Sequence, residues 1–181
     1  MNTIVLFVVL SIAVSASAQT ERTLHMLVKV RNVESGQLVG VDTANQGRNM
    51  VYAREGLQYY DWILEPDCFP NTNAPSYHLR LAANTNFRWN HARECRTKNT
   101  EVIIYNLGTE TKYNNYFRYD PQLETITVCD SNCVYVDPTS QELKSSNRCE
   151  NRNDKFEILF QGLADYTSTS QVNLDCFQQE A

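Results

Sequence analysis

Leu38-Val39-Gly40-Val41-Asp42 is matched 95 residues later by Cys133-Val134-Tyr135-Val136-Asp137, and this likeness decides the fold prediction. A second pair of landmarks, Trp62 and Phe156, is 94 residues apart. Two landmarks that give nearly the same offset indicate internal repeats, and self-similarity at a fixed period is the signature of a repeated architecture. If the offset spans two repeats, one repeat is about 47 residues long.

A middle repeat lies where this period places it. Trp89 follows Val41 by 48 residues, and Phe117 follows Trp62 by 55 residues. The second spacing is longer, which predicts a longer loop around Asn106–Asn115 in the middle repeat.

Short alternating or β-branched runs, bounded by Asn, Gly, Asp and Pro, are typical of an all-β domain. Twelve candidate strands form three groups of four: Met26–Arg31, Leu38–Asp42, Met50–Arg54, Asp61–Leu64, Tyr77–Leu81, Phe87–Asn90, Glu101–Tyr105, Tyr116–Tyr119, Thr125–Cys129, Cys133–Asp137, Glu142–Ser145 and Lys155–Phe160. One group cannot bury its apolar face alone, so we expect three to close into a disulfide-bonded β-trefoil. The alternative is an eight-stranded lipocalin-like barrel, although no Gly-x-Trp motif opens the chain.

The N-terminus predicts the compartment. Ile4–Val14 is an apolar run too short to span a bilayer, and Ala16-Ser17-Ala18 is a small-residue cleavage site, so residues 1–18 read as a signal peptide of this 181-residue chain. We expect a secreted, extracellular monomer with one β-trefoil domain at 19–162 and a C-terminal tail at 163–181, tethered by Cys176. No later stretch is apolar enough to insert into a membrane.

Charge and motifs exclude several classes of function. A net charge of −5 argues against nucleic-acid binding and against electrostatic attachment to a membrane surface. The sequence has no HExxH, Gly-x-Ser-x-Gly, P-loop or dinucleotide-binding motif. We expect no enzymatic activity and no cofactor. Glu65 and Asp67 are expected in a solvated loop, and His78 and His91 on strand surfaces.

Six cysteines follow the predicted cleavage site: Cys68, Cys95, Cys129, Cys133, Cys149 and Cys176. An even number in a secreted chain indicates disulfides, here up to three with 15 possible connectivities. There is no CxxC pair and no Cys/His cluster, so no metal site is expected.

The first repeat carries a family resemblance. Val30-Arg31-Asn32-Val33-Glu34-Ser35-Gly36-Gln37-Leu38-Val39-Gly40-Val41-Asp42, followed by Trp62-Ile63-Leu64, resembles the ricin-type B-lectin repeat with its V-x-N-x-x-S-G-x-x-L-x-V opening and closing W-x-L. The resemblance covers most of residues 26–161 and implies the β-trefoil fold.

The same resemblance implies a disulfide and a sugar site. A bridge between the second and third strands of a repeat implies Cys133–Cys149. For the remaining four cysteines we expect Cys68–Cys95 and Cys129–Cys176, and the rival to this set is Cys129–Cys133. The family's sugar site uses an Asp in the second strand. The corresponding positions hold Gly40 and Tyr135, the middle repeat offers no carboxylate there, and no Gln-x-Trp precedes the strand end, so the sugar-binding signature is missing.

Two segments are candidates for ligand contact. Tyr and Asn suit recognition on a rigid scaffold, which singles out Tyr113, Asn114, Asn115 and Tyr116, although packing of the tyrosines against the barrel is the alternative. Arg93 and Arg96 lie in the loop Asn90–Asn99, where an arginine near Cys95 could enter a trypsin-like specificity pocket.

These features lead to three hypotheses. The first is a secreted, non-enzymatic β-trefoil binding module that recognises an extracellular protein or glycan. The second is a protease inhibitor that resembles the Kunitz trefoils and uses the arginine loop. The third is a lipocalin-like carrier, which requires an open barrel interior. A growth-factor-like ligand is disfavoured, because the acidic balance does not suit heparin binding.

Overall fold

The computed structural model describes residues 23–45, 47–70, 72–93, 95, 97, 99–106, 113–129, 131–149, 152–166 and 174–177. The predicted signal peptide, 1–18, and Arg96 lie outside the described residues. Within these ranges, no helix has the length and apolarity that a membrane crossing requires.

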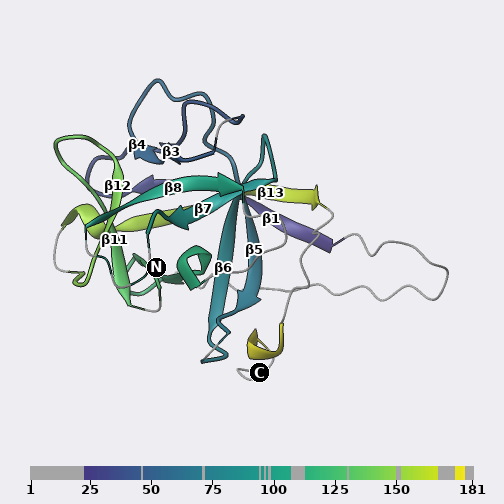
Figure 1. The fold of residues 1–181 in the computed structure, drawn as a ribbon. Coiled ribbons are helices and arrows are strands. Elements are labelled where there is room, and N and C mark those ends of the chain that lie inside the picture. Colours follow the sequence, from purple (N-terminus) through teal and green to yellow (C-terminus); the bar gives the residue numbers. More distant parts are fainter. Residues whose placement is uncertain are drawn as a thin grey trace, which may run out of the picture.

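The described residues form a chain of short strands (Figure 1). The strands are β1 (Thr23–Asn32), β2 (Val39–Gly40), β3 (Asn49–Met50), β4 (Tyr52–Ala53), β5 (Trp62–Cys68), β6 (Pro75–Leu81), β7 (Phe87–His91), β8 (Thr100–Asn106), β9 (Phe117–Asp120), β10 (Thr125–Val128), β11 (Asn132–Val136), β12 (Leu143–Ser146) and β13 (Phe156–Tyr166). Three single-turn 3-10 helices accompany them: η1 (Tyr113–Asn115), η2 (Arg152–Asp154) and η3 (Asp175–Phe177). Each predicted strand overlaps an observed strand.

Two boundaries differ from the sequence prediction. The third strand of the first repeat divides at Val51, whose N–H bonds the Val102 carbonyl at 3.0 Å and whose carbonyl accepts the Leu143 N–H at 2.8 Å. The segment changes partner there, because β3 pairs with β8 whereas β4 pairs with β2. At the other end, β13 continues along β1 to Tyr166, so the predicted domain boundary at 162 falls inside a strand.

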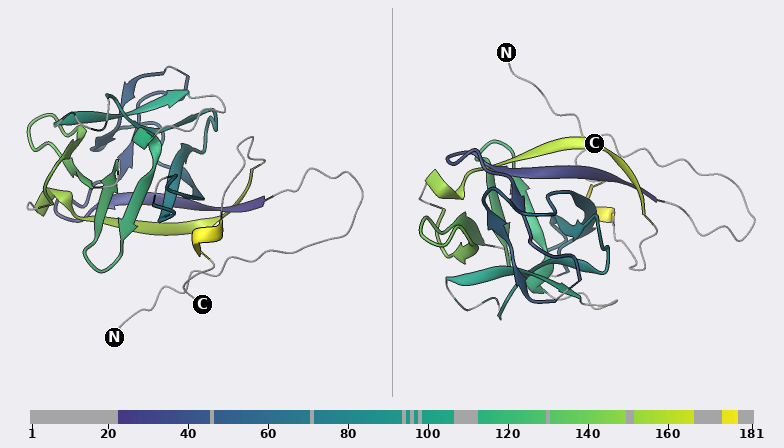
Figure 2. Two further views of the ribbon diagram at one scale, coloured as in Figure 1. Left: turned by 60° about the horizontal axis from the view of Figure 1, so that its bottom comes forward. Right: turned by 90° about the horizontal axis from the view of Figure 1, so that it is seen from above.

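Strand pairing closes a barrel. Antiparallel pairs link β13 to β1, β1 to β5, β5 to β6, β6 to β9 and β9 to β10. The bridge between Thr125 and Lys155, which immediately precedes β13, completes the ring. β1 and β13 run together along one side of the molecule (Figure 2).

Three hairpins cap one end of the barrel. They are β2 with β4, β7 with β8, and β11 with β12, one from each repeat. They also contact one another, through β3 with β8, β8 with β12, and the bridge between Tyr52 and Glu142. A barrel made from the outer strands of three repeats and capped by their inner hairpins is a β-trefoil.

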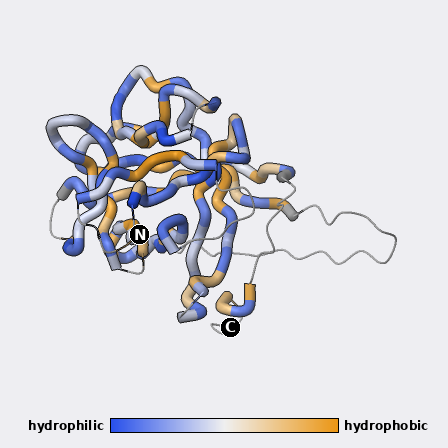
Figure 3. The backbone as a smooth tube through the Cα atoms, in the orientation of Figure 1, coloured by the Kyte–Doolittle hydropathy of each residue, from blue (hydrophilic) through white to orange (hydrophobic). Residues whose placement is uncertain are grey.

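Aromatic rings fill the barrel. Trp62, Trp89 and Phe117 are buried, with ring centroids 5.3 Å apart for the two tryptophans and 5.4 Å apart for Trp89 and Phe117. Trp62 also donates its Nε1–H to the Val39 carbonyl at 3.0 Å, which ties the barrel to the first cap strand. In Figure 3 the apolar backbone follows the strands, and the connections are largely hydrophilic. The lipocalin-like alternative is wrong, because side chains occupy the space that a carrier would leave for its ligand.

Asn32 explains the N-x-x-S-G part of the repeat. Its Oδ1 accepts the N–H of Ser35 at 3.0 Å and the hydroxyl of Ser35 at 2.8 Å. Its Nδ2 donates to the carbonyls of Asn153 at 3.2 Å and Lys155 at 3.0 Å. Gly36 completes the turn at a φ of 69°, a conformation that favours glycine. One buried side chain therefore shapes the β1–β2 turn and joins the first repeat to the third.

The disulfides correct part of the sequence prediction. Cys133 is bonded to Cys149, as the family resemblance implied. The pairs Cys68–Cys95 and Cys129–Cys176 are wrong, and the rival Cys129–Cys133 is not formed, because the bonds are Cys68–Cys176 and Cys95–Cys129. The tertiary structure explains this outcome: η3 lies against the end of β5, and the β10–β11 turn lies beside the β7–β8 loop, where Asn132 Nδ2 donates to the Cys95 carbonyl at 2.9 Å.

Candidate functional site

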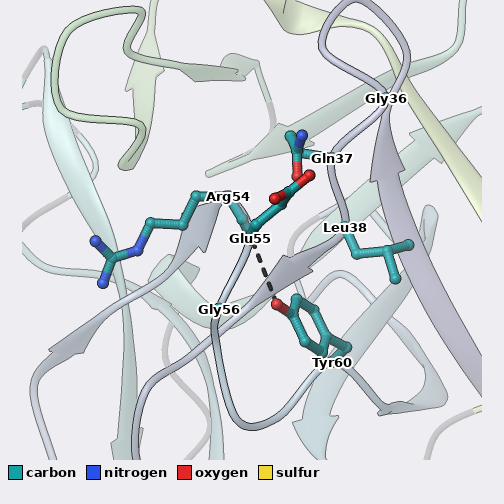
Figure 4. Close-up of a pocket in the computed structure, with 7 residues that line it drawn as sticks. All are labelled: Gly36, Gln37, Leu38, Arg54, Glu55, Gly56 and Tyr60. Carbon is teal, nitrogen blue, oxygen red and sulfur yellow. Dashed lines mark hydrogen bonds between the residues drawn. The ribbon is translucent and has the colours of Figure 1, made fainter.

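A hollow of about 350 Å³ opens in the first repeat, between the β1–β2 turn and the segment that follows β4 (Figure 4). Seven residues line it: Gly36, Gln37, Leu38, Arg54, Glu55, Gly56 and Tyr60. The space beside the two glycines is open, because a Cβ added at Gly36 or Gly56 would meet no atom within 4 Å. A ligand could therefore approach the backbone closely at both.

Tyr60 is held in place as one wall of the hollow. Its hydroxyl accepts the N–H of Leu57 at 2.8 Å and donates to the carbonyl of Arg54 at 3.4 Å. The ring is half-buried, so part of its surface stays accessible beside Leu38. A fixed aromatic surface contributes contact area at little cost in conformational entropy.

The two charged side chains of the lining behave differently. Arg54 extends away from Glu55 and Tyr60 in Figure 4, donates to Asp42 Oδ2 at 2.7 Å, and lies over the Tyr52 ring at 4.4 Å. Glu55 is exposed, and its carboxylate bonds no residue in the described part of the chain. The polar groups left for a ligand are the Glu55 carboxylate and the side-chain amide of Gln37.

The position that holds the sugar-binding Asp in ricin-type repeats is closed. A Cβ at Gly40 would lie 2.3 Å from the Tyr59 carbonyl oxygen and 2.9 Å from Cδ1 of Tyr60. The contact of 2.3 Å with a backbone atom leaves no room for a side chain at this position. The missing signature in the sequence therefore has a structural counterpart, since Tyr60, which precedes Asp61-Trp62 in place of the Gln of the family's Gln-x-Trp, lies where an Asp side chain would go.

The third repeat does not restore this site. Tyr135 occupies the corresponding position and pairs across the hairpin with Lys144. Lys144 Nζ lies 2.8 Å from Asp137 Oδ2, and this hydrogen bond, helped by the N–H groups of Ser140 and Thr139, lowers the pKa of Asp137 to about 2. The carboxylate two residues beyond the family position is thus already occupied by the protein's own donors.

The predicted tyrosine–asparagine segment divides between surface and interior. Tyr113 is 46% exposed, and its ring contacts Phe69. Asn114 Nδ2 donates to Asn90 Oδ1 at 3.2 Å and to the His91 carbonyl at 3.0 Å. Asn115 and Tyr116 are buried, which favours the alternative of packing against the barrel over contact with a ligand at the surface. The 3-10 turn η1 points them inward.

Two contacts hold described residues of the predicted arginine loop. Arg93 is exposed, and its carbonyl lies 2.8 Å from Nδ1 of His91. Cys95 is bonded to Cys129. Arg96 lies outside the described residues. The structure therefore offers one described arginine, Arg93, on a supported loop.

Buried polar side chains lie on the faces of β5 and β6 that point away from the barrel core. Arg80 Nε donates to Glu65 Oε2 at 2.6 Å. Asp67 Oδ2 lies 3.0 Å from His78 Nε2, and His78 Nδ1 donates to the Asn115 carbonyl at 2.9 Å. All five residues are buried, so the expected solvated loop and the expected surface position of His78 are wrong. These groups are paired and covered, which makes their role structural.

His91 is also buried, contrary to the expected surface position. Desolvation lowers its pKa, an effect that the Arg93 carbonyl and the charge of Glu101 only partly oppose. Desolvation likewise lowers the pKa of the buried His25 on β1. Both imidazoles therefore favour the neutral form in the folded protein.

The comparisons with known proteins show the fold. No family model and no curated protein matches the sequence. A designed threefold-symmetric protein, ThreeFoil, is similar with a TM-score of 0.58 and 14% identity, over 74% of this chain and 97% of that chain. A salivary protein of Culex quinquefasciatus from the Cys- and Trp-rich (CWRC) family is similar with a TM-score of 0.56 and 14% identity, over 75% of this chain and 92% of that chain.

A third similar structure is a plant protein. It is a non-toxic homologue of type II RIPs from Momordica charantia (bitter gourd), solved in complex with α-methyl-D-galactoside. The TM-score is 0.53 at 13% identity, over 75% of this chain and 48% of that chain. At these identities the likeness establishes a shared β-trefoil and nothing about the ligand.

Proposed function

We propose that this protein is an extracellular, non-enzymatic binding module whose ligand is a glycan, held in the hollow of the first repeat. One observation carries the proposal: the fixed ring of Tyr60 faces an opening beside two polar side chains, Gln37 and Glu55, that form no bond with the described residues. Sugar sites combine an apolar surface for the ring's C–H face with a few polar groups for its hydroxyls.

Two further lines support the proposal. The Momordica charantia protein is described in complex with a galactoside, and the same fold is found here. Three disulfides suit an oxidising extracellular compartment, as the predicted signal peptide does. The chain departs from the family at the second-strand Asp, so the proposed ligand position is the hollow lined by Gln37 and Tyr60.

A glycan array probed with the secreted, oxidised protein tests the proposal. Gln37→Ala removes one lining amide without touching the core, and it should weaken the strongest glycan signals. Phe160→Ala is the matched control, because it removes an exposed aromatic ring outside the hollow and should leave those signals intact. No retained glycan, or loss with Phe160→Ala alone, would overturn the proposal.

A second function is favoured by the predicted arginine loop. Protease inhibitors of the substrate-like kind present a side chain from a loop that stays rigid when bound, and rigidity lowers the entropic cost of binding. Arg93 meets this description, since His91 and the Cys95–Cys129 bond hold its loop. Inhibition of trypsin at micromolar concentration, lost in Arg93→Ala, would favour this function over glycan binding.

A further inference from the structure

The hollow of the first repeat has a chemical bias that limits its ligand. Of the two charged side chains in its lining, the cationic one is withdrawn. The Arg54 guanidinium is bonded to Asp42 at 2.7 Å and lies over Tyr52 at 4.4 Å, on the side away from Tyr60. An anionic ligand would have to break this ion pair to reach a positive charge.

The anionic side chain faces the opening. In Figure 4 Glu55 and Gln37 reach toward the same space from opposite segments. Neither side chain bonds any residue in the described ranges, so neither must give up a protein partner to bind a ligand. Tyr60 and Leu38 supply the apolar wall on the other side.

These groups have a definite preference for ligand donors. An ionised carboxylate only accepts hydrogen bonds, so it pairs with hydroxyl or ammonium donors and repels carboxylates and sulfates. Hydrogen bonds to a charged acceptor are about twice as strong as neutral ones. The bond from a sugar hydroxyl to Glu55 would therefore dominate the polar contacts of the hollow.

We infer that Glu55 is the specificity-determining residue of this site and that the hollow selects an uncharged or amine-bearing pyranose and rejects acidic sugars. The inference rests on the proposed glycan-binding function. In this site, the segment after β4 supplies the carboxylate that is absent from β2 at Gly40. The adjacent Gly56, with a φ of 76°, turns the chain so that Glu55 borders the hollow.

Nuclear magnetic resonance titration of the secreted, oxidised protein tests the inference. The probes are methyl galactoside as the neutral sugar, glucosamine as the amine and glucuronate as the acid, followed at the amide signals of Gly36, Gly56 and Gln37. We expect the neutral sugar or glucosamine to shift these signals and glucuronate to leave them unchanged. Binding by both the neutral sugar and the amine identifies the shared donor chemistry, whereas binding by glucosamine alone identifies the ammonium as the recognised group.

Glu55→Gln is the decisive variant, because it keeps the size and removes the charge. We expect affinity for the preferred sugar to fall about tenfold, the difference between a charge-assisted and a neutral hydrogen bond. Discrimination against glucuronate should fall with it. Glu34→Gln is the control, since Glu34 is exposed on the same β1–β2 turn but does not line the hollow.

The outcomes separate the two proposals. If no sugar shifts the hollow signals, the proposed function fails. If sugars bind there but glucuronate binds best, or if Glu55→Gln matches the wild type, the inference about Glu55 fails and the glycan-binding function stands.

Discussion

Asn32→Ala should be among the most destabilising polar substitutions in this protein. The side chain is fully buried and makes four hydrogen bonds, two that fold the β1–β2 turn and two that reach the start of β13. A hydrogen bond contributes about 1 kcal/mol net, and the two at exposed Ser35 count for about half, because water replaces them. We therefore expect a loss of about 3 kcal/mol in the free energy of unfolding.

Guanidinium unfolding with intact disulfides measures this loss, with the fluorescence of the buried Trp62 and Trp89 as the signal. Asn32→Asp keeps the acceptor for Ser35 but turns a carboxylate toward the Asn153 and Lys155 carbonyls, so it should cost at least as much. Asn45→Ala, at an exposed position, is the control and should stay within about 0.5 kcal/mol of the wild type. If Asn32→Ala costs no more than that control, the reasoning about the turn is refuted.

Three further predictions concern the buried polar groups and the closed sugar position. Glu65→Ala and Arg80→Ala should each destabilise the fold by about 3–5 kcal/mol, while a paired hydrophobic replacement should cost much less; equal costs in calorimetry would contradict a buried ion pair. His25 and His91 have lowered pKa values, so the unfolded state binds more protons below about pH 6.5 and stability should fall as the pH drops from 7.5 to 5.5. His91→Gln should flatten that dependence in denaturant midpoints, and an unchanged slope would count against it. Gly40→Asp should destabilise the protein without creating sugar affinity, because the added Cβ meets a carbonyl oxygen at 2.3 Å; a gain of galactoside binding in titration would show the position to be open.

The strand pattern could be predicted from the sequence. Which strand residues are covered by other parts of the protein could not. Alternation along β5 places Glu65 opposite the core residues Trp62 and Leu64, but alternation alone assigns that face to solvent. Burial of Glu65 follows from the tertiary partner Arg80, across the β5–β6 pair. Tyr116 follows the same logic, since the turn η1 and the ring of His78 at 4.6 Å decide that it points inward.

The candidate site shows the same division. Gln37 and Gly36 lie in the motif that identified the first repeat, but the motif does not reveal a hollow beside it. The hollow exists because the segment after β4 returns to the β1–β2 turn and carries Glu55 and Tyr60 with it. The withdrawal of Arg54 toward Asp42 also depends on this return. In the sequence, the one signal that bears on this site is the absence of the second-strand Asp at Gly40.

By itself, the sequence determined the repeat period and the strands, because both follow from local residue patterns and from their recurrence along the chain, whereas the resemblance to ricin-type repeats implied the Cys133–Cys149 bridge. The tertiary structure alone decided the Cys68–Cys176 bond, which joins positions 108 residues apart, and the burial of Glu65. The physical reason is that local periodicity fixes which face of a strand a residue occupies. Only the closure of three repeats on one another fixes what covers that face.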